Sequence, residues 1–191
     1  GDLQPVPFLT VGFGEEAGDP RVAIETGYSA DGIIIHATVK DTAPTVFPEL
    51  GIDSPKFWCQ DHVEFRLLTD DDRDMRQIQV ILAASGRVLV SVPGEKAVEL
   101  ASELSMSVTG WSLRMVLPYD VLKIPVLDAD TCYRGLFAYT RWGSGHMRIS
   151  SMSATRLGFA HAERFAELIF GHADRPVMLC AVKGLDKVFS P

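Results

Sequence analysis

The alternation of side chains in the stretch His62–Leu67 constrains the fold of this chain more than any other feature. Successive side chains of a β-strand point to opposite faces, so a strict alternation separates two faces of different character. The apolar face is formed by Val63, Phe65 and Leu67, and the polar face by His62, Glu64 and Arg66. This pattern is typical of an antiparallel sheet with one face on a core and the other in solvent. We therefore predict a central strand in a half-solvated sheet.

Short apolar or alternating segments, separated by turn residues, continue on both sides of this strand. The predicted strands are Pro5–Phe13, Arg21–Tyr28, Ile33–Lys40, Met75–Ala83, Arg87–Val92, Met106–Val108, Trp111–Leu117, Tyr133–Trp142, Phe165–Phe170 and Val177–Val182. Pro118–Leu122 is predicted as a short helical turn, Glu95–Leu104 also fits a helix, and residues 143–153 are predicted as a polar loop. This arrangement predicts an all-β fold, an antiparallel β-sandwich of the immunoglobulin or jelly-roll kind with one or two short helical turns. The length of 191 residues suits a single domain over residues 1–191.

The composition excludes several classes of protein. Apolar residues make up 47% and charged residues 23% of the chain, so a folded core is expected. The net charge of −7, without a Lys/Arg cluster, argues against nucleic acids and anionic membrane surfaces as partners. No apolar run is long enough to span a bilayer. The cysteines are Cys59, Cys132 and Cys180, and their odd number without a CxxC motif supports neither a disulfide framework nor a zinc knuckle.

Acidic residues gather at the tip of the hairpin that follows the central strand. They are Asp70, Asp71, Asp72 and Asp74. Clustered carboxylates can hold Ca²⁺, which makes these residues weak candidates for a structural metal site. A solvated turn explains the cluster more simply, because the spacing of an EF-hand loop is absent.

Four motifs follow one another between about residue 20 and residue 170. They are a strand ending in Asp (Ile33–Asp41), an aromatic-x-x-D-x-V-E-F strand (Trp58–Phe65), a G-W segment ending in Pro (Gly110–Pro118) and a closing S-A-T…H…F-x-E-L-x-F segment (Ser153–Phe170). In this order the chain resembles the family 9 carbohydrate-binding modules, within the wider group of DOMON-like sandwiches. The resemblance implies an antiparallel sandwich that binds sugars without cleaving them.

The resemblance also implies how the sugar is held and where the protein works. Characterised members clamp a pyranose between two tryptophans, and some carry structural Ca²⁺. A secreted or periplasmic location is implied, as is attachment to, or association with, a glycoside-processing enzyme. This chain departs from the pattern at two places, with Arg114 near the position of a usual Glu and Met152 at the position of a usual Trp. Trp142 is the alternative second wall of the clamp.

The alternation of the predicted strands brings further polar side chains to the face of the central strand. Together with the tryptophans at strand ends, the ligand-binding candidates are Trp58, Glu64, Arg66, Gln77, Gln79, Arg114, Arg141 and Trp142. Arginine, glutamine and glutamate side chains bind hydroxyl groups, and indole rings stack on the C–H faces of a sugar. The alternative is an ordinary solvated sheet face with cross-strand ion pairs. Trp111 shares the parity of apolar neighbours and is predicted to lie in the core.

No residue set indicates catalysis, and we expect a protein that is not an enzyme. The sequence contains no G-x-S-x-G elbow and no H-E-x-x-H motif, and it places no pair of carboxylates for acid–base chemistry. Two alternatives to sugar binding remain open. One is a b-haem domain of the DOMON type, whose axial ligands would be Met147 or Met152 with His146, His62 or His161; this ranks below sugar binding, because no spacing selects these residues. The other is a sandwich that docks proteins and holds no small ligand.

Overall fold

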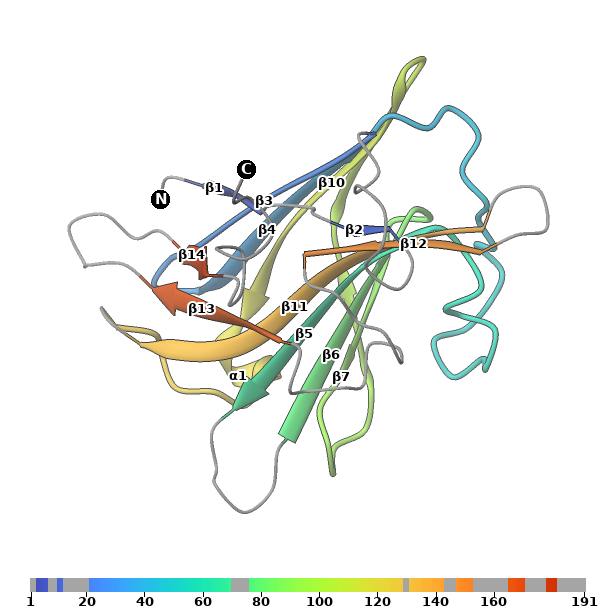
Figure 1. The fold of residues 1–191 in the computed structure, drawn as a ribbon. Coiled ribbons are helices and arrows are strands. Elements are labelled where there is room, and N and C mark those ends of the chain that lie inside the picture. The colour runs from blue at the N-terminus through green and yellow to red at the C-terminus, as the bar shows by residue number, and fades with distance from the viewer. Residues whose placement is uncertain are drawn as a thin grey trace, which may run out of the picture.

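The fold is a sandwich of two antiparallel β-sheets, as predicted (Figure 1). It is seen in a computed structural model that describes residues 3–6, 10–11, 21–69, 76–128, 131–142, 147–152, 165–170 and 178–181. None of the described helices is long and apolar enough to cross a membrane.

The first sheet has five strands and the second has nine among the described residues. The first sheet runs in the order β1 (Gln4–Val6), β3 (Val22–Tyr28), β4 (Gly32–Val39), β10 (Gly110–Pro118) and β9 (Glu103–Ser107). The second runs in the order β14 (Met178–Ala181), β13 (Ala166–Phe170), β11 (Cys132–Arg141), β5 (His62–Thr69), β6 (Arg76–Ala83), β7 (Arg87–Ser91) and β8 (Val98–Ala101). Beside this path, β12 (Arg148–Ser151) pairs with β11 and with β2 (Thr10–Val11).

The core lies between the two sheets and is built from the apolar parity of each strand. Val63, Phe65 and Leu67 of β5 are fully buried there, as their alternation predicts. The ring of Phe65 stacks on that of Phe137 in β11, with centroids 4.6 Å apart. Trp111 of β10 is 2% exposed, which confirms its predicted place in the core. Burial of large side chains of this kind is the dominant favourable contribution to folding.

Three segments test the secondary-structure predictions. The helix α1 (Tyr119–Leu122) follows Pro118, as predicted. The helical alternative for residues 95–104 is wrong: the four-residue spacing of Leu100 and Leu104 suits either period, and pairing with β7 and β10 selects the strands β8 and β9. The polar loop predicted over residues 143–153 is wrong at Arg148–Ser151, which pair with β11 as β12. Backbone pairing with a long neighbour outweighs the polar character of this short strand.

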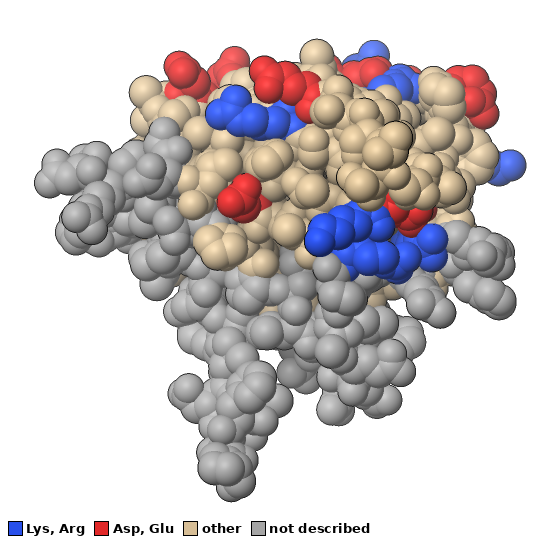
Figure 2. Space-filling view, turned by 90° about the horizontal axis from the view of Figure 1, so that it is seen from above, with Lys and Arg blue, Asp and Glu red and all other residues tan. Residues whose placement is uncertain are grey.

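Charged side chains of both signs are interspersed on the surface. On the face seen in Figure 2, Lys and Arg lie beside Asp and Glu, without an extended patch of one sign among the described residues.

Candidate functional site

A hollow of about 400 Å³ lies on the outward face of the second sheet, opposite the core. Its lining comes from β5, β6, β11 and β12, from Met147 just before β12, and from the loop that precedes β5. The lining residues are Trp58, His62, Glu64, Arg66, Gln79, Ile81, Thr140, Met147 and Ile149. Pairing explains the convergence, since Arg66 lies opposite Gln79 and Thr140 lies between His62 and Ile149. The volume falls within the range of about 300–1,000 Å³ that is usual for small-molecule sites.

The hollow is deepened by residues 40–61, which we call the cover loop, at one end of the sheet face. Phe57 of this loop is 1% exposed and packs with Ile81 and Ala83 in a second apolar cluster. Arg87 of β7 holds the loop: its guanidinium lies 5.7 Å from the centroid of the Phe57 ring and donates a hydrogen bond to the carbonyl of Leu50. The cover loop therefore forms one wall of the hollow, and its apolar contacts fix that wall in place.

The prediction that the polar face of β5 is exposed to solvent is wrong. The polar face of β5 was expected to be open to solvent, yet Glu64 is 4% exposed and His62 is 3% exposed. Alternation correctly separates the two faces, but it cannot show which other elements will pack over the polar one. A buried charge requires a partner, because its transfer from water is costly.

Glu64 obtains its partners from two neighbouring side chains, Arg66 and Gln79, and these three residues together with Gln77 form what we call the polar cluster. The Nε group of Arg66 and the Nε2 group of Gln79 each donate to Oε1 of Glu64 over 2.6 Å. Arg66 also donates from Nη1 to Oε1 of Gln77. The side chains of Arg66 and Glu64 are 14% and 5% exposed. The sequence predicted all four as candidates, and the structure brings them together.

The polar cluster leaves two strong hydrogen-bonding groups unused by the described residues. Both protein donors converge on Oε1 of Glu64, so Oε2 carries no hydrogen bond from a described residue. Nη2 of Arg66 likewise makes no such bond, because the guanidinium uses Nε and Nη1. A carboxylate oxygen accepts and a guanidinium donates, so the pair offers complementary contacts to a ligand hydroxyl.

His62 adds a neutral ring to the lining. Its Nδ1 lies 2.6 Å from the carbonyl oxygen of Gln60, and a carbonyl can only accept, so Nδ1 carries the proton. Burial lowers the pKa of His62, an effect that outweighs the attraction of Glu64 for the protonated ring. The ring is therefore neutral near pH 7, and Nε2 is an acceptor.

A pair of tryptophans lies beside the hollow. The rings of Trp58 and Trp142 have centroids 5.8 Å apart and are tilted by 55°. The indole Nε1 of Trp142 donates to the carbonyl oxygen of Trp58 over 3.1 Å. Trp58 lines the hollow and is 49% exposed, whereas Trp142 is half-buried. Both tryptophans predicted as stacking candidates therefore lie together, with Trp58 open to a ligand.

Two other predicted residues lie elsewhere. Arg114 belongs to β10 of the first sheet and lies 3.9 Å from Glu103, so the structure does not bring it to the hollow. Arg141 shares the inward parity of Tyr139 and donates from Nε to Oδ2 of Asp41 over 2.5 Å. Burial raises the pKa of Asp41, but the hydrogen bonds from Arg141 and the Ala43 amide outweigh it, so the pKa is lowered.

The described residues do not test the metal and haem alternatives, although Met147 and His62, one of the predicted haem-ligand pairs, both line the hollow. The acidic candidates Asp70, Asp71, Asp72 and Asp74 lie outside the described part of the chain, as do His146 and His161. Among the residues that are described, no group of three His, Cys, Asp or Glu side chains is placed to hold a metal ion. Met152 is fully buried in the core, and His62 is bound to the backbone through Nδ1.

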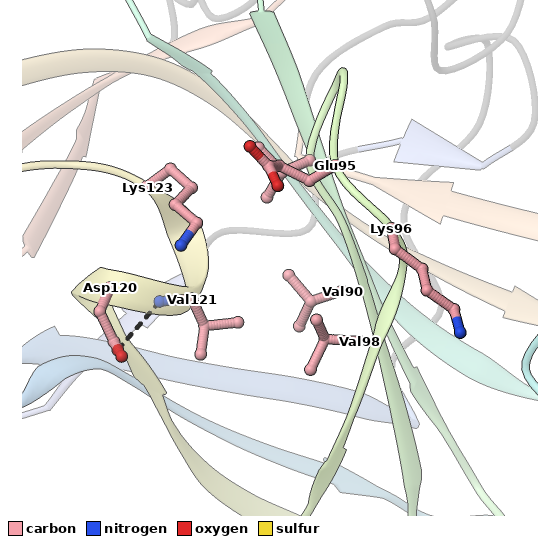
Figure 3. A pocket seen from close by; sticks show the side chains of 8 residues that line it. Val90, Glu95, Lys96, Val98, Asp120, Val121 and Lys123 are labelled. Carbon is pink, nitrogen blue, oxygen red and sulfur yellow. Dashed lines mark hydrogen bonds between the residues drawn. The ribbon is translucent and has the colours of Figure 1, made fainter.

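A second, smaller hollow of about 180 Å³ lies where the β7–β8 turn approaches α1. Figure 3 shows Val90, Val98 and Val121 facing one another, with Glu95, Lys96, Asp120 and Lys123 around them. Asp120 is engaged by its own helix, since its Oδ1 accepts from the amide of Val121 over 2.9 Å. The charged side chains of the second hollow are exposed and lie over apolar side chains. The polar groups of the first hollow are buried or half-buried, and those of the polar cluster are hydrogen-bonded to one another.

Sequence reasoning missed part of the lining. Met147 and Ile149 were assigned to a loop, and Ile81 was not considered because it is apolar. The alternation of Tyr133–Trp142 alone does not decide whether Thr140 or its neighbours Tyr139 and Arg141 face outward; the buried Tyr139, which packs near Trp111 in the core, assigns Thr140 to the outward face. Phe137 and Tyr139 lie two residues apart and therefore share a face, so a sequence argument that places Phe137 in the core also places Thr140 on the outward face.

Comparisons with known proteins identify the fold. No model of a protein family matches the sequence, and no curated protein matches it. A crystal structure from Bacteroides uniformis, of a protein assigned as carbohydrate-binding, matches with a TM-score of 0.63 and 16% identity over 93% of this chain and 85% of that one. A family 9 carbohydrate-binding module from Caldicellulosiruptor kristjanssonii in complex with glucose matches with a TM-score of 0.62 and 13% identity, over 91% and 87%. A family 9 module from the same organism with cellotriose gives 0.59 and 12%, over 89% and 83%. The chain therefore has the fold of these carbohydrate-binding proteins.

Proposed function

We propose that this chain is a non-catalytic carbohydrate-binding domain of the family 9 kind and that the hollow on the second sheet binds a mono- or oligosaccharide. The observation that carries the proposal is the exposed ring of Trp58 beside a floor of buried, fixed polar groups. The shared fold adds support, because two of the similar structures are complexes with glucose and cellotriose.

The chemistry of the hollow suits a sugar ring. The indole of Trp58 presents a flat apolar surface for the C–H groups of a pyranose face. Oε2 of Glu64 accepts from one hydroxyl, and Nη2 of Arg66 donates to the same or a neighbouring hydroxyl. The protein hydrogen bonds to Oε1 and Nη1 hold these groups in place before the ligand arrives, so little conformational entropy is lost on binding.

The lining also supports a binding role rather than hydrolysis. Among the described residues that line the hollow, Glu64 is the only carboxylate, and it is paired with Arg66. Glycoside hydrolysis requires two carboxyl groups on either side of the scissile bond. We therefore propose that a bound glycan leaves the hollow unchanged.

Isothermal titration with glucose and cellotriose tests the proposal. Wild-type protein should bind at least one of them, and Trp58→Ala and Gln79→Ala should each weaken binding tenfold or more. Arg114→Ala is the matched control, since this residue lies on the opposite sheet, and its affinity should equal that of the wild type. Absence of binding to any glycan of a broad array would refute the function. Binding that survives Trp58→Ala and Gln79→Ala would refute the site.

A further inference from the structure

Asp61, directly before β5, is a buried charged residue that does not line the hollow. It is 1% exposed. Burial raises the pKa of its carboxyl group, although hydrogen bonds from the Trp142 and Thr45 amides oppose this effect. A carboxylate in such a place is costly, and a neutral side chain would avoid that cost. Because of this cost, the contacts of the Asp61 carboxylate indicate a role other than stabilising the fold.

Besides accepting from the amide of Ala84 through its backbone carbonyl, Asp61 makes contacts that lead toward the tryptophan pair. Its Oδ1 accepts from the backbone amide of Trp142 over 2.6 Å. Its own amide donates to the carbonyl oxygen of Thr45 over 2.8 Å. Thr45 in turn donates from Oγ1 to the carbonyl oxygen of Trp142 over 2.7 Å. Asp61 and Thr45 thus hold the Trp142 peptide from both its amide and its carbonyl side.

The chain of contacts continues to the ring that a ligand would meet. Trp142, once its backbone is fixed, donates from Nε1 to the carbonyl oxygen of Trp58 and packs its ring against the Trp58 ring. Trp58 is 49% exposed, and its ring contact among the described residues is the one with Trp142. The position of the exposed indole depends on the end of β11, and that end depends on Asp61.

We propose that Asp61 is a positioning residue of the hollow, whose carboxylate fixes Trp142 and through it the stacking ring of Trp58. The inference rests on the proposed sugar binding for its effect on affinity, but its effect on the two rings is independent of any ligand. A displaced stacking surface weakens binding without removing a single ligand contact, because stacking requires the ring at a defined place and angle.

Asp41 provides a matched control. It is a buried carboxylate at the adjoining end of the sandwich, 8% exposed, and it accepts from Arg141 and from the amide of Ala43. Neither of these contacts reaches an indole ring. Asp41→Asn therefore removes a buried charge that acts on Arg141, the residue before Trp142, while the hydrogen bonds to Trp142 itself stay in place.

The test compares Asp61→Asn, Asp41→Asn and Trp142→Phe with the wild type, by near-ultraviolet circular dichroism and by titration with glucose and cellotriose. Asparagine keeps one acceptor oxygen but turns a donating NH2 group toward one of the two backbone amides, of Trp142 and Thr45, that the carboxylate accepts from. Asp61→Asn should therefore change the tryptophan bands in the same sense as Trp142→Phe and weaken sugar binding at least fivefold. Asp41→Asn should leave the bands unchanged and the affinity within twofold, even if it lowers the melting temperature. Where Asp61→Asn does not fold, Thr45→Val removes the carbonyl-side contact and should give the same two changes to a lesser degree.

The outcomes separate the two proposals. If the wild type binds no sugar, the proposed function fails, and the circular dichroism alone decides the positioning role. Bands that differ in Asp61→Asn but not in Asp41→Asn support that role. Wild-type bands and affinity in folded Asp61→Asn, or in Thr45→Val where Asp61→Asn does not fold, overturn it. Equal changes in Asp61→Asn and Asp41→Asn also overturn it, because they would show a general loss of packing.

Discussion

Removal of the Glu64 side chain should destabilise the protein far more than removal of an ordinary glutamate. In Glu64→Ala, the Arg66 guanidinium, 14% exposed, loses its charged partner, and Gln79 loses the acceptor for its Nε2 group. An unpaired buried charge of this kind costs about 3–5 kcal/mol of the free energy of unfolding. For a chain of this size, that loss lowers the melting temperature by about 6–20 °C.

Urea unfolding at pH 7, followed by tryptophan fluorescence, measures this effect. The matched control is Glu103→Ala, whose carboxylate lies 3.9 Å from Arg114, with side chains 80% and 53% exposed. An exposed pair of this kind contributes little, so we expect a change of less than about 0.5 kcal/mol. The double variant Glu64→Leu with Arg66→Met removes both charges and should lose less than Glu64→Ala alone.

The result that refutes this reasoning is equally clear. If Glu64→Ala changes the free energy of unfolding no more than Glu103→Ala does, the polar cluster is not a buried and mutually dependent unit. If the double variant is as unstable as Glu64→Ala, the loss arises from packing rather than from an unpaired charge. Either outcome would remove the physical basis for a preorganised floor of the hollow.

Two further changes test the buried state of His62 in the hollow and the close packing of β4 on β10 in the first sheet. His62 has a folded pKa lowered by burial, so below about pH 6.5 the unfolded chain binds the proton and stability falls as pH decreases, by up to about 1.4 kcal/mol per pH unit. His62→Asn should therefore show a shallower loss between pH 7 and pH 5, and an unchanged slope would contradict the buried neutral ring. Gly32→Ala should destabilise by more than about 2 kcal/mol or prevent folding, because the new Cβ would lie 2.1 Å from the carbonyl oxygen of Leu117. A melting temperature equal to that of the wild type would show that β4 and β10 are not so close.

The two-sheet fold and the core of the central strand could be predicted because they depend on local patterning. Val63, Phe65 and Leu67 repeat with the period of a strand, and that repeat fixes which face is buried wherever the strand pairs. The polar cluster followed from the same reasoning, since Gln77 and Gln79 share a parity on the neighbouring strand. Its members come together because β5 and β6 pair as a simple hairpin.

The rest depends on contacts between distant parts of the chain. Alternation placed Arg114 on a polar face but could not say which sheet would carry β10. Glu64 is 4% exposed in a hollow to which other elements contribute Trp58, Met147 and Ile149, and the pattern of β5 does not show these contributions. The role inferred for Asp61 depends on Trp142, eighty-one residues further along the chain. Such distances have no signal in a single sequence.

A crystal structure of the protein with cellotriose is the measurement that decides whether the hollow on the second sheet is the sugar-binding site. We expect one glucose unit in the hollow, stacked on the ring of Trp58, with a hydroxyl within hydrogen-bonding distance of Oε2 of Glu64 and of Nη2 of Arg66. A sugar bound instead at the small hollow beside α1 or on the outer face of the first sheet would contradict this assignment. So would a Trp58 ring that makes no contact with the ligand.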